Sequence, residues 1–224
     1  MKRFFLLIAF LNLGLLHLNA QQTRKISGGL RVGMGASDIF YKQFDAKPRL
    51  QNYQIAAFVD IPVQDVYAIS TGLEWTQKGS FKPVIGSEES IKRSADYLQI
   101  PIYFSFLERK MRFDVGVYGG YALNGKEILF ENDKPTQNII DILDGNRDNY
   151  VTIRRYDAGM GIRIGYTLSR FDFLLQTQIG LVKLERNLPV YVWAKPLGLV
   201  RANEEFYSGR NFSVGFSVGY RIWK

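Results

Sequence analysis

The sequence contains no cysteine and one histidine, His17, which lies within the first twenty residues. Without cysteine, the chain cannot form the disulfide scaffold that stabilises many secreted domains. If the first twenty residues are removed, the mature chain has neither histidine nor cysteine. Ser–His and Cys–His nucleophilic catalysis and nearly all zinc sites are then excluded. Catalysis by paired carboxylates or by a Ser–Lys arrangement stays open, but no local motif indicates either.

Long hydrophobic runs are also lacking, except near the start of the chain. Two basic residues at positions 2–3 precede an apolar run over residues 4–16, and Ala20 follows shortly after. This layout is typical of a secretory signal peptide, so we expect residues 1–20 to be a signal peptide and residues 21–224 to be the mature domain. An uncleaved anchor is the alternative, but the run is shorter than the roughly 20 residues that a spanning helix needs.

The charge is not concentrated in any one segment. Without the expected signal peptide, 27 basic residues face 21 acidic ones, a net charge of +6. These charges are scattered, and no run of Lys and Arg is present that would follow a phosphate backbone. We therefore expect no nucleic-acid partner. No motif indicates a cofactor.

What the chain does contain is a repeated alternation of apolar and small polar residues. Between Phe212 and Ile222, every second residue is apolar, and serine, glycine and arginine fill the gaps. Successive side chains of a strand point to opposite faces, so this pattern predicts a strand with one apolar and one polar face. Eight stretches show the pattern: residues 29–36, 53–61, 67–75, 97–106, 113–121, 155–168, 171–184 and 211–224.

The segments between these strands alternate in length. Residues 62–65, 108–110 and 169–170 are short turns, whereas residues 37–52, 79–94, 124–149 and 185–210 are long polar loops. All long loops then lie at one end of the sheet, and the short turns and both termini at the other. An even number of antiparallel strands with this asymmetry is typical of bacterial outer-membrane proteins. We therefore predict an all-β fold, an eight-stranded antiparallel transmembrane β-barrel formed by residues 21–224.

A soluble, lipocalin-like barrel is the main structural alternative, and it would bury the apolar face around a ligand. Two features favour lipid instead. The polar face is rich in glycine and serine, which fits the narrow interior of an eight-stranded barrel. The apolar face carries large residues at nearly every position, and these would overfill such an interior. Aromatic residues expected at the membrane–water interfaces are Trp75, Tyr121, Tyr166, Phe171, Tyr220 and Trp223.

Charged residues on the polar face are the main candidate site. A charge in a narrow lumen is costly unless it is paired, so opposite signs are expected to meet across the barrel. We predict a polar lumen network that closes the pore, with Glu74 and Arg163 at its core. Its other members are Arg31, Asp157 and Arg221, and Asp60, Asp114, Arg155 and Asp172 share their face. A proton or ion path, or a gated opening, is the functional alternative.

Two loops carry weaker signals. Asp144, Asn146 and Asp148 have the spacing of the first three ligands of a calcium loop, but Asn149 replaces the required glycine. The loop over residues 124–149 is therefore expected to be a solvated acidic loop, and divalent binding stays an open hypothesis. Residues 188–193 are unusually apolar for a loop. They are expected to extend a strand or form a packed hairpin, with an exposed partner-binding segment as the alternative.

Five stretches taken together resemble the PorT-like outer-membrane β-barrel family of Bacteroidetes-type bacteria. The sequences GLEWTQKGS, YLQIPI, DVGVYGGYAL, DAGMGIRIGY and QIGLVKL, at residues 72–80, 97–102, 114–123, 157–166 and 178–184, occur in the family order. The resemblance implies an outer-membrane barrel and an association with type IX secretion and gliding machinery. It implies no catalytic or ligand residue. The last residue, Lys224, departs from the usual aromatic ending of such barrels, although Trp223 precedes it.

The expected function is therefore non-enzymatic. We predict an outer-membrane barrel with long surface loops and a structural or interaction role in the cell envelope, linked to secretion or gliding machinery. Its expected partners are outer-membrane lipid and an envelope or secretion-machinery protein. A small, selective, porin-like channel is the first alternative. A membrane enzyme and a soluble carrier are the others.

Overall fold

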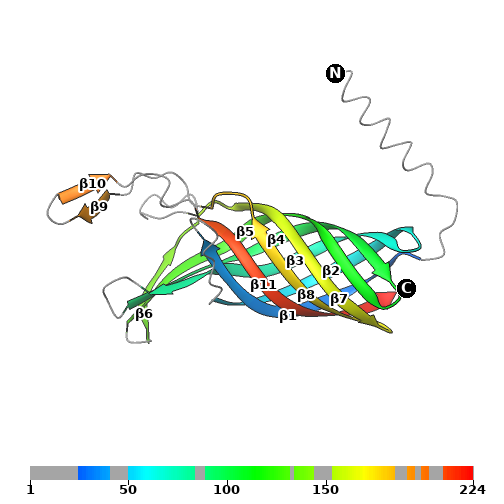
Figure 1. Ribbon diagram of the computed structural model, residues 1–224. Helices are drawn as coiled ribbons and strands as arrows, with labels where there is room; N and C mark the ends of the chain where they lie inside the picture. Colours follow the sequence, from blue (N-terminus) through cyan, green and yellow to red (C-terminus); the bar gives the residue numbers. More distant parts are fainter. Residues whose placement is uncertain are drawn as a thin grey trace, which may run out of the picture.

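The computed structural model describes residues 25–40, 50–83, 89–131, 134–143, 153–184, 191–194, 198–201 and 209–223, and every regular element in these ranges is a β-strand. The expected signal peptide lies outside them. No helix of the described residues is long and apolar enough to span a membrane. The strands (Figure 1) are β1 (Ser27–Phe40), β2 (Leu50–Gln64), β3 (Tyr67–Pro83), β4 (Glu89–Glu108), β5 (Met111–Glu131), β6 (Lys134–Asp141), β7 (Tyr156–Leu168), β8 (Phe171–Gly180), β9 (Tyr191–Ala194), β10 (Gly198–Arg201) and β11 (Arg210–Trp223).

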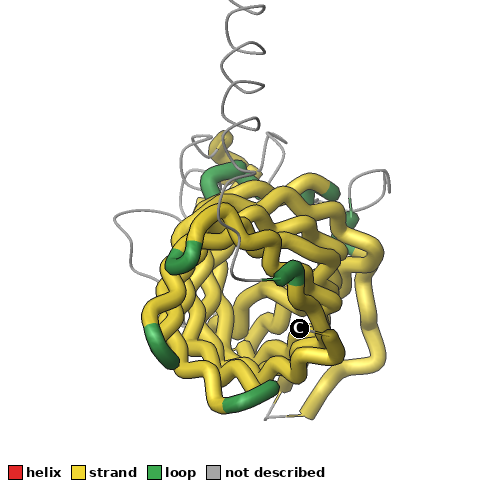
Figure 2. The backbone as a smooth tube through the Cα atoms, turned by 90° about the vertical axis from the view of Figure 1, so that its right-hand side faces the viewer, coloured by secondary structure: helices red, strands yellow, loops and turns green. Residues whose placement is uncertain are grey.

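Eight of these strands close into a barrel. The order is β1-β2-β3-β4-β5-β7-β8-β11, each neighbouring pair is antiparallel, and β11 pairs with β1 to complete the ring. Figure 2 shows the ring of strands from the end that carries the short turns and the C-terminus. A closed ring satisfies the backbone hydrogen bonds of every strand without an open edge. The prediction of an eight-stranded antiparallel barrel is confirmed.

Several strands continue beyond the predicted limits, so the predicted long loops at residues 37–52, 79–94 and 124–149 are wrong in extent. β1 runs to Phe40 and β2 begins at Leu50, while β3 and β4 pair as far as Pro83 and Ser90. β5 continues to Glu131, where β6 pairs with it. The alternation of apolar and polar residues disappears in these extensions because neither face meets lipid. The backbone pairing continues without that sequence signal.

Beyond β8 the chain also differs from the prediction. β8 ends at Gly180, four residues before the predicted limit, although Leu184 remains buried. The apolar segment over residues 188–193 contributes its last residues to β9, which forms a separate two-stranded sheet with β10. Figure 1 places this hairpin at the same end as β6, opposite the short turns.

The apolar side chains of the barrel strands face outward. Ile102 and Ile162 are 54% and 47% exposed, and the other large exposed hydrophobic residues continue this belt around the strands. The interior is polar instead: among the described residues, 25 polar or charged side chains are buried against 16 hydrophobic ones. Soluble domains show the reverse distribution. The lipocalin-like alternative is therefore excluded, because it requires the apolar face inside.

The height of the apolar belt matches a bilayer. Tyr156 and Tyr166 face outward on β7 and lie ten residues apart. A rise of about 3.3 Å per residue and a tilt of about 40° give a height of about 25 Å, the height of the apolar band of outer-membrane barrels. At the long-loop end of the belt, Tyr121 packs against Tyr156, with ring centroids 5.3 Å apart. At the short-turn end, Phe171 packs against Tyr220, with ring centroids also 5.3 Å apart.

The six aromatic residues expected at the interfaces lie near the two ends of this belt. Trp75, half-buried, and Tyr121, exposed, are on the long-loop side. Tyr166, Phe171, Tyr220 and Trp223 are exposed on the short-turn side. Just above Tyr121, the polar residues begin: Gln77 and Asn124 both donate hydrogen bonds to Asp96, at 3.2 and 3.0 Å. The protruding parts of β3, β4 and β5 thus begin with polar residues on their outer face, and further out Phe81 packs against Phe130, with ring centroids 5.7 Å apart.

Candidate functional site

The lumen of the barrel is filled by charged side chains of both signs. Apart from Asp38 near the long-loop end of β1, the buried charges on the barrel strands are five cations and five carboxylates. The largest fully buried side chains include three arginines, two tyrosines and a lysine. Because strand side chains alternate, each of these residues lies on the inward face of its strand. The cations are Arg31, Lys78, Arg112, Arg163 and Arg221, and the anions are Asp60, Glu74, Asp114, Asp157 and Asp172.

Arg112 organises the cluster at the short-turn end. It enters the lumen near the start of β5 and donates to both carboxylate oxygens of Asp60, at 2.7 and 3.0 Å. Its Nε lies 2.9 Å from Oδ1 of Asp114, two residues along the same strand. A guanidinium group is planar and presents several donors at once, so it can hold two carboxylates in fixed orientations. Arg112 therefore ties β5 to β2 across the lumen.

Arg221 completes this cluster from β11. Its Nη2 lies 3.0 Å from Asp60 and 2.9 Å from Asp172, and its Nη1 donates to the hydroxyl of Ser27 at 2.6 Å. The hydroxyl of Thr167 donates to the other oxygen of Asp172 at 2.7 Å. The cluster contains two cations and three carboxylates, a formal charge of −1. It joins the first and last strands of the barrel to β2 and β8.

The middle of the lumen is crossed by an ion pair between β7 and β3. Nη2 of Arg163 donates to Oε2 of Glu74 at 2.9 Å, and Gln99 donates to Oε1 of the same carboxylate at 2.6 Å. The guanidinium of Arg163 lies over the ring of Tyr103, 4.1 Å from its centroid. This contact is a favourable cation–π arrangement in a desolvated site. Glu74 is thereby paired on both oxygens.

Arg31 lies between these two clusters and is held differently. Its guanidinium stacks on the ring of Phe58, 4.6 Å from the centroid, and the side chain is 1% exposed. Its Nε and Nη2 have no hydrogen-bond partner among the described residues. With Arg163 and Glu74 it gives the middle of the lumen a formal charge of +1. This charge offsets the −1 of the short-turn cluster, so the lumen is neutral as a whole.

Asp157 anchors the cluster at the long-loop end. Its Oδ2 lies 3.2 Å from Nζ of Lys78 and accepts hydrogen bonds from Tyr118 at 3.2 Å and Asn211 at 3.0 Å. Nζ of Lys78 also lies 3.9 Å from the ring centroid of Tyr118. Side chains from β3, β5 and β11 thus converge on one oxygen of this carboxylate, while Oδ1 has no hydrogen-bond partner among the described residues. Together the three clusters connect strands on all sides of the barrel.

Glycines on β7 make room for the tyrosine rings that cross the lumen. In the strand register Tyr103 lies opposite Gly116, which lies opposite Gly161 on the next strand. A Cβ atom added at Gly161 would lie 2.2 Å from the hydroxyl oxygen of Tyr103. One at Gly159 would lie 2.7 Å from that of Tyr118. The glycine-rich inner face is therefore the packing partner of these rings.

Replacing Gly161 with alanine is expected to destabilise the barrel by about 1–3 kcal/mol, because the added methyl group overpacks the lumen against Tyr103. Adding Tyr103→Phe to this variant removes the contacting hydroxyl, so the double variant should cost less than the sum of the single ones. Urea unfolding in phospholipid vesicles, followed by tryptophan fluorescence, measures both effects.

Gly119 provides the matched control on the outward face. An added Cβ there meets no atom within 4 Å. Gly119→Ala is therefore expected to change the unfolding free energy by less than about 0.5 kcal/mol. Equal effects of the two alanine substitutions would show that the lumen is not tightly packed at Gly161.

The structure places all five residues of the predicted lumen network inside the barrel, and it pairs Glu74 with Arg163. Arg31, Asp157 and Arg221 belong to three different clusters rather than to one network. Arg155 shared the predicted face, but it precedes β7 and is only half-buried. The calcium-like residues 144–149 lie outside the described residues. In the part of the chain that the structure describes, no group of three His, Cys, Asp or Glu side chains is arranged to hold a metal ion.

Sequence reasoning missed two central members, Arg112 and Lys78. Both carried a usable signal. Arg112 lies two positions before Asp114 and Lys78 four positions after Glu74, so each falls on the inward face by simple alternation. They were overlooked because both lie outside the predicted strand limits, at residues 113 and 75. Correct strand ends would have included them.

A comparison with protein families agrees with the barrel architecture. Residues 19–185 match the model of the outer membrane protein beta-barrel domain family. The chain belongs to this family. The match covers most of the barrel strands, and the chain is therefore an outer-membrane β-barrel with its apolar belt in lipid.

The solved structures that resemble this chain do so at low sequence identity. Ail, the attachment invasion locus protein of Yersinia pestis, has a TM-score of 0.47 and 9% identity, with 89% of this chain and 100% of that chain covered. A second structure of Ail, in complex with the heparin analogue sucrose octasulfate, gives 0.46 and 8% with the same coverage. The comparison with curated proteins gives no match.

Proposed function

We propose that this outer-membrane barrel is a non-enzymatic, non-conducting protein with a structural or interaction role in the envelope. One observation carries the proposal. The lumen is crossed at three levels by paired, buried charges, centred on Arg112, Arg163 and Asp157. Paired charges of this kind lock neighbouring strands together and occupy the space that an aqueous channel requires.

The protruding strands provide the surface for the interaction role. On the long-loop side, β3, β4, β5 and β6 form a sheet that extends beyond the aromatic residues, and Arg93 and Glu127 form an ion pair on it at 2.5 Å. Loops and strand extensions outside the membrane are where barrels carry binding sites. The resemblance of residues 72–80 and 97–102 to PorT-like barrels supports a partner in secretion or gliding machinery.

Two sequence features support the remaining parts of the proposal. Residues 1–20 would direct export as a signal peptide, which an outer-membrane destination requires. The mature chain would then have no histidine or cysteine for general-base or nucleophilic chemistry. The first feature supports the location, and the second favours a barrel that binds over one that catalyses.

A small selective channel is the second candidate, and Arg31 favours it. Two of its buried guanidinium nitrogens have no partner among the described residues, and polar groups in such a position are usually satisfied by water. Water beside Arg31 would place a hydrated segment between the middle and short-turn clusters. A narrow ion path could use that segment.

Single-channel recording in planar bilayers separates the two candidates. The full barrel should insert, as shown by flotation with liposomes, and give no steady conductance. Steady conductance on the scale of a porin would refute the closed lumen. A small conductance that Arg31→Met removes would instead establish the channel function.

A further inference from the structure

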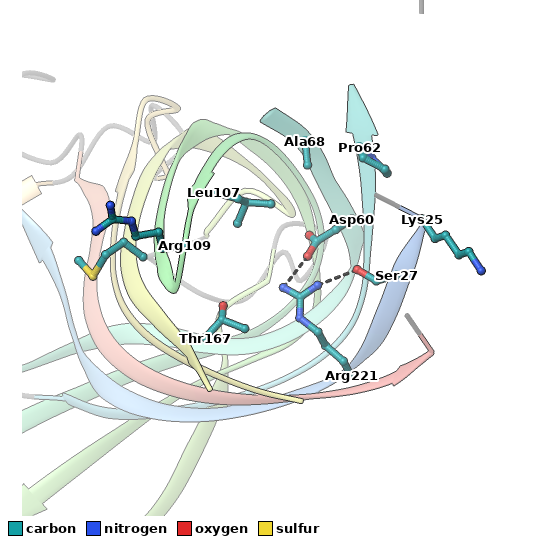
Figure 3. A pocket seen from close by; sticks show the side chains of 10 residues that line it. Lys25, Ser27, Asp60, Pro62, Ala68, Leu107, Arg109, Thr167 and Arg221 are labelled. Atoms are coloured by element: carbon teal, nitrogen blue, oxygen red, sulfur yellow. Dashed lines mark hydrogen bonds and ion pairs between the residues drawn. The ribbon is translucent and has the colours of Figure 1, made fainter. Parts of the chain in front are cut away.

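The mouth of the barrel at the short-turn end contains a pocket of about 510 Å³ (Figure 3). Its floor is formed by Arg221, Ser27 and Asp60, which are joined by the hydrogen bond and ion pair already described. Lys25 precedes β1 and Arg109 lies on the turn between β4 and β5, and the two line the rim from opposite sides (Figure 3). In Figure 3 the long, exposed side chain of Lys25 extends away from the floor. In outer-membrane barrels the short turns and the termini face the periplasm, so the pocket opens to that compartment.

The pocket carries a net positive charge. Its lining includes three cations, Lys25, Arg109 and Arg221, and one carboxylate, Asp60. That carboxylate is already occupied, because Arg112 holds both of its oxygens and Arg221 holds one. Lys25 and Arg109 are exposed, and neither has an ion-pair partner within the described ranges. A concave site with unpaired cations over a paired floor attracts an anionic group.

The backbone conformation of Arg109 is set by its turn. Arg109 has a φ of 53°, in the left-handed region that favours glycine, at a two-residue turn. A residue with a Cβ in this region is strained by about 1–2 kcal/mol. Glycine would relieve the strain but would remove the cation from the rim. Ser169, in the two-residue turn between β7 and β8, has a φ of 56°, so this conformation is a property of the tight turns.

One wall of the pocket is apolar. Pro62 and Ala68 are buried, and Leu107 is half-buried beside them. Small ligand sites commonly combine an apolar wall with a few polar groups that fix orientation. The pocket therefore fits a ligand that has an anionic group beside a short apolar group.

We propose that this pocket binds an acidic, extended peptide segment of a periplasmic partner. The floor residues Ser27, Asp60 and Arg221 lie within the ring of strands (Figure 3). The pocket also reaches Met111, which faces outward at the short-turn rim and is 56% exposed, so a lipid headgroup is the alternative occupant. The polar floor and the aqueous mouth favour a peptide. This site is separate from the long-loop surface, and its existence does not depend on whether the lumen conducts.

Fluorescence polarisation on the full barrel in phosphatidylcholine nanodiscs tests the proposal. The probe is a fluorescein-labelled hexapeptide with two central glutamates flanked by alanine and glycine, and its partner probe has glutamine instead. The glutamate peptide should bind at least about tenfold more tightly than the glutamine peptide, because only its carboxylates meet Lys25 and Arg109. The double variant K25E/R109E should weaken binding of the glutamate peptide by about tenfold or more.

The matched control is K110E/R170E, which reverses two exposed cations at the same end of the barrel that do not line the pocket. It should weaken binding less than about twofold. If the two double variants lost affinity for the glutamate peptide equally, the binding would reflect general attraction by charge, and the proposed site would be wrong. No preference for the glutamate peptide, or no binding at all, would also overturn it. A further sample uses nanodiscs that also contain phosphatidylglycerol. If native mass spectrometry shows phosphatidylglycerol bound to the unchanged barrel but not to K25E/R109E, while the peptide does not bind, the site belongs to lipid instead.

Discussion

Replacing Arg112 with methionine is expected to lower the unfolding free energy of the barrel by about 3–5 kcal/mol. The guanidinium is fully buried and lies within ion-pair distance of three carboxylates, Asp60, Asp114 and Asp172. Removing one partner of a buried ion pair leaves the other charge unpaired in a low-dielectric site. This unpaired charge, rather than the lost attraction, accounts for most of the destabilisation. Only Arg221 would remain against three negative charges. Urea unfolding in phospholipid vesicles measures the loss.

A triple variant separates lost pairing from lost packing. In R112M/D60N/D114N the carboxylates that Arg112 contacts most closely become neutral amides of similar shape. Stability should then recover in part, because no excess negative charge stays buried. The control is Arg170→Met, at an exposed turn position, which should change stability by less than about 0.5 kcal/mol. If R112M behaves like the Arg170 control, the short-turn cluster does not hold the strands together.

The fold was largely predictable because membrane and lumen impose opposite demands on alternate residues. The stretch from Phe212 to Ile222 shows this directly, since its apolar residues face lipid and its serines and glycines line the lumen. The same rule gave the number of strands and the end at which the short turns lie. It also placed Arg163 and Glu74 on the inward face. Period-two alternation carries this information because it depends only on the strand itself.

Other features depend on the assembled barrel and left no local pattern. Alternation assigns a residue to a face but not to a partner: Asp114 lies opposite Arg163 in the strand register, yet its closest cation is Arg112. Partners across a lumen are set by the stagger of the strands and by side-chain length. The strand extensions beyond the membrane escaped prediction for a different reason. There, as at the paired residues Phe81 and Lys92, the outer face lies beyond the aromatic residues at the membrane limit, and the alternation is lost.

Replacing Ile162 with arginine is the second substitution with a large expected effect, a loss of about 2–4 kcal/mol. Ile162 faces outward on β7 near the midpoint between Tyr156 and Tyr166, and it lies opposite Val115 and Thr177 on the neighbouring strands. A guanidinium at this height must leave water for hydrocarbon. The cost falls toward the membrane surface, where a long side chain can reach the headgroups. Leu168→Arg, at the short-turn end of the same strand, should therefore cost only about 0–1 kcal/mol.

The depth dependence along β7 is the most direct measurement of the outward, lipid-facing orientation on which every other conclusion depends. Arginine is placed singly at Met160, Ile162, Ile164 and Leu168, and each variant is unfolded with urea in phospholipid vesicles. The destabilisation should be greatest at Ile162 and decline toward Leu168. A flat profile near zero would contradict this orientation, because it would place the apolar face of the barrel in water.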